Sequence, residues 1–224
     1  MFIDKSVIDK AVEGYKEMLA YHQYIEKLFE TLDNRFEYGE NGKRLLPVSK
    51  KQLFANSNDY ALYSHTEYPC DIWLPPWHGR FYVDLDGLGD DINNLSNIDD
   101  YPTERVVNLV FVWTWLGYND AHVADTEHPE CWIGFVKPQP TDPKTRLYDV
   151  CDMMWKFIRI ETTTEEEVEG WIKGCFSPNN FGSQLNGTWE IKRFPLDKLS
   201  TMYEIQTLVV SPLTERFNQL EKAM

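Results

Sequence analysis

The apolar run over residues 105–116 constrains the fold more than any other segment of the chain. After one Arg it consists of Val, Leu, Phe and Trp, interrupted only by one Asn and one Thr. β-Branched and aromatic residues at this density predict a central strand that is covered on both faces. The apolar segment Cys131–Val136 follows a polar connection and predicts the antiparallel return strand. Pro138 and Pro140 are expected to end that strand.

The N-terminal segment predicts one long helix over residues 6–35, ended by Gly39 and Gly42. Two interleaved sets of residues repeat every seven positions and place a narrow apolar stripe on this helix. They are Ile8, Tyr15, His22, Phe29 and Phe36, and Ala11, Met18, Ile25 and Leu32. We expect the helix to lie across a sheet. A homodimer through this helix is the alternative, although Tyr and His are unusual in a coiled-coil seam.

The C-terminal third predicts helices with one or two strands. Asp142 and Pro143 predict the start of one helix, and the capping box Thr164-x-x-Glu167 predicts a second helix that reaches Cys175. A terminal helical arm over residues 203–220 is expected to be kinked or broken at Pro212.

Short aromatic runs punctuated by Pro and Gly predict further strands at 60–65, 71–74, 79–85 and 188–194. The fold class is therefore α+β, with a mainly antiparallel sheet, a long N-terminal helix and helices packed on one or both faces. We expect a single domain over 1–224, composed of the helix at 1–38, a β-rich acidic region at 60–137, and helices with one or two strands at 142–224.

Charge is concentrated in the same region as the apolar run. Residues 81–136 contain eleven acidic residues and one basic residue, a net −10 of the −14 of the whole chain. This balance predicts an acidic interaction protein that binds a basic protein partner and inhibits or neutralises it, as immunity proteins and DNA-mimicking inhibitors do. The residues expected to contact the partner are Asp84, Asp86, Asp90, Asp91, Asp99, Asp100, Glu127 and Glu130.

The composition also argues against other partners and locations. A pI near 4.7 argues against direct nucleic-acid binding and against anionic membrane surfaces. The four cysteines form no C-x-x-C pair, and the N-terminal residues lack the pattern of a signal peptide. We therefore expect reduced thiols and a cytoplasmic location.

A cluster of candidate metal ligands predicts an alternative function. Asp120, His122, Asp125 and His128 lie within nine residues of one connection, and imidazole with carboxylate suits Zn or Mn. A metal-bound water there would make the protein a hydrolase of phosphoester or nucleotide substrates. The competing interpretation is a solvated hairpin loop. The alternation of Asp and Gly over residues 84–91 also resembles a Ca site, but it lacks the ligands of an EF-hand at the fifth and twelfth positions.

Aromatic residues offer a third interpretation. Trp113 and Trp115 share one face of the predicted central strand with Phe111, and such a stripe can line a pocket that binds a small planar ligand. The competing interpretation is plain core beneath Tyr15, Met18, His22 and Ile25 of the long helix. No P-loop, dinucleotide-binding or nucleophile-elbow motif is present, so the catalytic residues are unknown and the sequence favours a protein that is not an enzyme.

Overall fold

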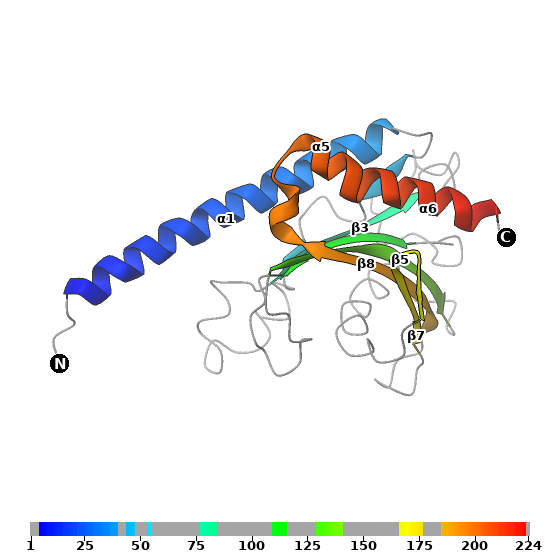
Figure 1. The fold of residues 1–224 in the computed structure, drawn as a ribbon, viewed down its shortest axis with the longest axis horizontal. Helices are drawn as coiled ribbons and strands as arrows, with labels where there is room; N and C mark the ends of the chain where they lie inside the picture. The colour runs from blue at the N-terminus through cyan, green and yellow to red at the C-terminus, as the bar shows by residue number, and fades with distance from the viewer. Residues whose placement is uncertain are drawn as a thin grey trace.

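An eight-stranded antiparallel sheet forms the centre of the protein (Figure 1). The structure is a computed structural model and describes residues 5–39, 44–47, 53–54, 77–84, 109–115, 129–140, 166–176 and 185–222. The strand order is β1-β3-β4-β5-β8-β7-β6, and β2 also pairs with β3. The strands are β1 (Leu45–Pro47), β2 (Leu53–Phe54), β3 (Trp77–Asp84), β4 (Leu109–Trp115), β5 (Glu130–Pro140), β6 (Glu166–Val168), β7 (Trp171–Phe176) and β8 (Leu185–Pro195). The prediction of an α+β fold is confirmed.

The predicted central strand is β4, which pairs with β3 on one side and with β5 on the other. Its consecutive residues Val110, Phe111 and Val112 are all fully buried. Because successive side chains of a strand point to opposite faces, both faces of β4 are covered, as predicted.

The strand β5 does not end at its prolines. It continues through Pro138 and Pro140 and stays paired with β8 as far as Leu185. The two prolines are two residues apart, so their nitrogens point to the same edge of the strand. The described residues of β4 stop opposite Val136, so both prolines lie beyond the described pairing of β5 with β4.

The helix predicted from Thr164 to Cys175 is wrong. This segment contains the β6–β7 hairpin, joined by a two-residue turn at Glu169 and Gly170. Both turn residues have positive φ, 55° and 77°, which is the backbone that a tight hairpin turn requires. Cys175 accordingly lies exposed on a strand and not at the end of a helix.

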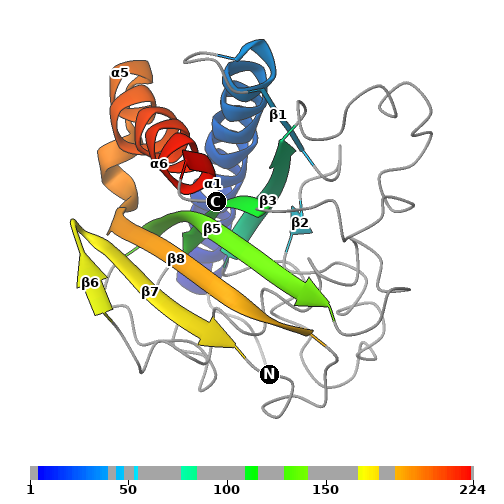
Figure 2. The same ribbon diagram turned by 90° about the vertical axis from the view of Figure 1, so that its right-hand side faces the viewer.

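All the described helices lie on one face of the sheet (Figure 2). The long helix α1 (Lys5–Tyr38) ends at Gly39, whose φ of 72° suits a helix C-terminus. The C-terminal helices lie beside α1 on the same face (Figure 2). There the 3-10 helix η5 (Leu196–Leu199) leads into α5 (Met202–Ile205), the π-helical turn η6 (Gln206–Val210) and α6 (Ser211–Lys222). The predicted terminal arm is thus helical, and the expected break at Pro212 is a widened turn just before it.

The main core lies between these helices and the sheet. From α1 it contains Ile25, Leu28, Phe29, Leu32 and Phe36, which belong to the C-terminal half of the helix. The sheet contributes Tyr82, Val110, Val112, Cys131, Ile133 and Phe135, and the C-terminal arm contributes Val209, Val210, Leu213 and Phe217. The N-terminal half of α1 projects beyond the sheet (Figure 1). The expected packing across the sheet therefore holds for only half of the helix.

Candidate functional site

Two acid-rich connections join the central strands, and their described ends lie at opposite ends of the sheet. Asp84 is the last residue of β3, while Glu130 is the first residue of β5. In the register of the sheet, Val83 pairs with Leu109, whereas Glu130 pairs with Trp115. The 85–108 connection is therefore anchored at one end of β4 and the 116–129 connection at the other. Seven strand residues separate the two anchors by roughly 20 Å.

Of the eight acidic residues predicted to contact a partner, the structure describes two. Asp84 and Glu130 are both partly exposed at the strand ends. A Glu130 carboxylate oxygen accepts a hydrogen bond of 2.7 Å from the indole Nε1 of Trp132, which holds that carboxylate in place. The other six lie outside the described residues: Asp86, Asp90, Asp91, Asp99, Asp100 and Glu127.

The predicted metal ligands Asp120, His122, Asp125 and His128 also lie outside the described residues, and the metal site stays a prediction. Within the described part of the chain, no three His, Cys, Asp or Glu side chains form a group that could hold a metal ion.

Of the predicted aromatic stripe on β4, Phe111 lies on the sheet face turned away from α1. Residues Val110 and Val112 of β4 pack in the core with the helix, so Phe111 between them belongs to the opposite face. The side chains of Trp113 and Trp115 lie outside what the structure describes. Ile25 of α1 packs with Val110 and Val112 and not over Phe111, and sequence alternation alone does not reveal which face of a strand meets a distant helix. The choice between core and pocket for Trp113 and Trp115 stays a prediction.

The backbone register sets further tryptophan positions opposite one another. Trp115 pairs with Trp77 of β3, and Trp113 pairs with Trp132 of β5. Trp132 is fully buried, and the Arg193 guanidinium lies 5.5 Å from its ring centroid. The use of Trp113 and Trp115 as a ligand pocket stays a prediction.

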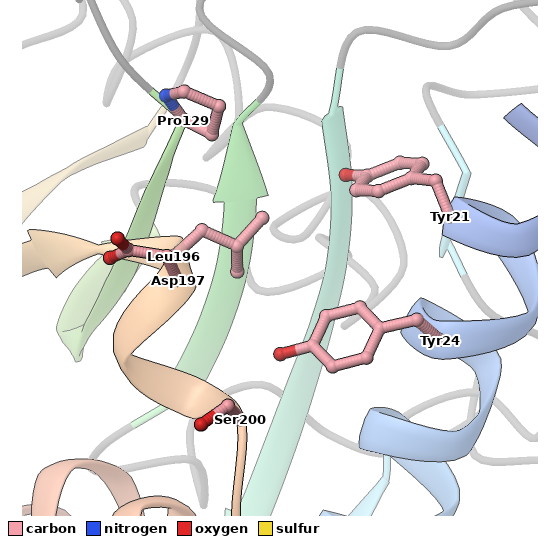
Figure 3. A pocket seen from close by; sticks show the side chains of 6 residues that line it. All are labelled: Tyr21, Tyr24, Pro129, Leu196, Asp197 and Ser200. Atoms are coloured by element: carbon pink, nitrogen blue, oxygen red, sulfur yellow. The ribbon is translucent and has the colours of Figure 1, made fainter. Parts of the chain in front are cut away.

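A pocket of about 300 Å³ lies between α1, the start of β5 and η5 (Figure 3). The rings of Tyr21 and Tyr24 form one wall, and Leu196 faces them from η5. The remaining lining residues are Pro129, Asp197 and Ser200. A pocket of this shape could hold one apolar group of a partner, with hydroxyl and carboxylate groups at its margin.

Backbone and hydroxyl hydrogen bonds fix the walls of this pocket. The Leu196 N–H donates to the Pro129 carbonyl at 2.9 Å, and the Tyr24 hydroxyl donates to the Leu199 carbonyl at 2.9 Å. Burial raises the pKa of both Tyr21 and Tyr24 to about 12, so both phenols stay neutral at physiological pH. Sequence reasoning missed this site because its walls come from three distant segments. The available signal was the i, i+3 spacing of two tyrosines on one helix face.

Cys131 does not suit nucleophilic catalysis. Cys131 is fully buried in the core beneath α1, and burial raises the pKa of its thiol. A thiol held in its neutral form is a poor nucleophile. Cys175 is exposed and free.

Comparisons with known proteins give no relative: no protein-family model matches the chain, and neither curated protein sequences nor solved structures produce a significant match. Among the described helices, none combines the length and apolar character needed to cross a membrane.

Proposed function

We propose that this protein binds a basic protein partner through its two acid-rich connections and thereby blocks the partner's own binding surface. The observation that carries the proposal is charge segregation. Residues 85–108 carry six acidic residues and one basic residue, and residues 116–129 carry three acidic residues and no Lys or Arg. Asp84 and Glu130 add one negative charge at each anchor.

The strands that carry these connections support the proposal. Buried residues on both faces of β3, β4 and β5 make a rigid base, and a rigid base reduces the entropy lost when its connections bind a partner. A surface of a single sign accelerates encounter with a basic protein and disfavours acidic competitors. The partner class is therefore a protein with a Lys- and Arg-rich face, such as the nucleic-acid-binding face of a nuclease.

The test is capture of the partner at low salt followed by titration of the purified pair. Immobilised full-length protein is incubated with host lysate, and the bound protein is identified, purified and measured by calorimetry at increasing salt. We expect a basic partner whose Kd rises at least tenfold between 50 and 300 mM salt. Failure to capture a salt-sensitive basic protein would contradict the proposal.

Charge-neutralising variants then identify the end of the sheet that binds. A fourfold variant replaces Asp90, Asp91, Asp99 and Asp100 with Asn and removes four negative charges from the 85–108 connection. A matched control replaces four exposed acids of α1 with Gln: Glu13, Glu17, Glu26 and Glu30. We expect the first variant to slow association about tenfold or more and the control to change it far less. Equal effects of the two variants on the association rate would show that binding depends on the net charge of the protein and not on the 85–108 connection.

A further inference from the structure

The projecting half of α1 carries an exposed apolar stripe. Ile8, Val12, Tyr15 and Leu19 follow the i, i+4, i+7, i+11 spacing that places residues on one helix face. Their exposed fractions are 50, 49, 68 and 47%. Among the residues that the structure describes, none packs against this stripe. A helical segment of about 16 residues without tertiary contacts is marginally stable in water, so this stripe fits a surface that is covered by a partner.

We infer that the stripe is covered by the same stripe of a second copy of the chain, with the two helices antiparallel. Superposing the stripe on itself in the antiparallel sense sets Ile8 opposite Leu19 and Val12 opposite Tyr15. The two-fold axis then passes midway between Val12 and Tyr15.

Charge decides the orientation. Asp9 and Lys16 flank the stripe on the same side, and antiparallel pairing brings Asp9 of each copy near the level of Lys16 of the other. The same helix face continues toward the body of the protein with the exposed acids Glu26, Glu30 and Glu37. Parallel pairing would align these acids with their own copies, which is unfavourable. Antiparallel pairing instead brings the Lys5 end of one helix, with its positive dipole, toward Glu26 of the other.

The area is sufficient for a reversible dimer. At the exposed fractions above, the four stripe side chains of both copies bury about 800 Å², and flanking side chains raise the total toward the roughly 1,000 Å² of a specific interface. An interface at this lower limit is typical of weak, reversible association.

Sedimentation velocity of the full-length chain from 1 to 200 μM tests the pairing. We expect concentration-dependent dimers in the wild type and a monomer at every concentration for Tyr15→Glu. The matched control Ala20→Glu adds the same charge at an exposed position outside the stripe and should dimerise like the wild type. Circular dichroism checks that both variants stay folded. A wild type that stays monomeric, or a dimer that Tyr15→Glu leaves intact, would overturn the proposal.

Cross-linking of an isotopically mixed sample tests the orientation. In the antiparallel pair, Lys5 of one copy lies about 9 Å along the axis from Lys16 of the other, while the two Lys5 residues lie about 25 Å apart. A short amine-reactive cross-linker should therefore join Lys5 to Lys16 between copies. Intermolecular links between Lys5 and Lys5 would mean a parallel pair and would overturn the antiparallel arrangement.

Discussion

At the residue scale, one buried cation ties the long helix to the sheet. Arg80 of β3 is 5% exposed, and its guanidinium donates to the carboxylate of Asp33 on α1. The Tyr82 hydroxyl donates to the other carboxylate oxygen at 3.1 Å, and the guanidinium lies 5.4 Å from the ring centroid of Phe29. A carboxylate shared by two donors from β3 fixes where α1 crosses the sheet.

Removing this carboxylate should destabilise the fold. Asp33→Ala leaves the buried Arg80 cation without its acceptor, and the free energy of unfolding should fall by about 3 kcal/mol. Urea denaturation followed by circular dichroism measures the change. The control Glu17→Ala lies on the exposed part of the same helix and should change the free energy by less than about 0.5 kcal/mol. Equal stabilities of the two variants would contradict this account of Asp33.

The buried tyrosines predict a loss of stability at alkaline pH. Burial raises the pKa of Tyr21 and Tyr24 from 10.0 to about 12, and that of Tyr82 further still. In the unfolded chain these phenols release protons near pH 10, whereas in the folded protein they keep them. The stabilisation is complete below pH 10 and is lost as pH rises toward 12. Urea denaturation at pH 8 to 11 should show this fall.

Tyr24→Phe serves as the comparison for the alkaline transition. It removes one phenol and the hydrogen bond to Leu199, so it should cost about 1 kcal/mol at pH 8. It should also make the fall above pH 10 less steep than in the wild type. A slope identical to that of the wild type would exclude Tyr24 as a contributor.

At the element scale, the β6–β7 hairpin shows why a capping signal can mislead. Thr164 and Glu167 have the spacing of a capping box, but Glu169 and Gly170 both adopt the left-handed backbone, which ends any helix there. A real capping box forms at Thr201 and Glu204, where both reciprocal hydrogen bonds are present. The difference is context: after Thr201 the chain continues for five turns without a turn-forming Gly.

The 116–129 connection is the element in which the metal hypothesis can be tested. If His122 and His128 bind Zn or Mn, adding either ion should raise the Tm of the wild type by several degrees, because an ion that binds only the folded state stabilises it. His122→Ala should remove that increase. Asn119→Ala changes a residue of the same connection that is not a predicted metal ligand, and it should keep the increase in Tm. Scanning calorimetry with and without a chelator measures the shifts, and a wild type with no shift would contradict the metal site.

At the scale of the whole molecule, local patterns predicted the elements better than their arrangement. The long helix, β4, the start of β5, β8 and the C-terminal helical arm follow from periodicity and composition within short windows. The face of β4 that meets α1 cannot be predicted from such short windows, because it depends on contacts between segments about 80 residues apart. The pocket at Tyr21 and Tyr24 was missed for the same reason: Leu196 reaches it only after β8 has paired with β5.

The unequal packing of α1 gives one helix two local stabilities. Amide hydrogens around Phe29 and Leu32 are protected by the core and should exchange with solvent only on global unfolding, whereas those around Val12 can exchange by fraying. If two copies pair through the stripe, the slow-exchanging stretch should extend toward the N-terminus as the protein is concentrated. Dimerisation would then be detected within a single helix, as a shift toward the N-terminus of the boundary between slow and fast deuterium uptake.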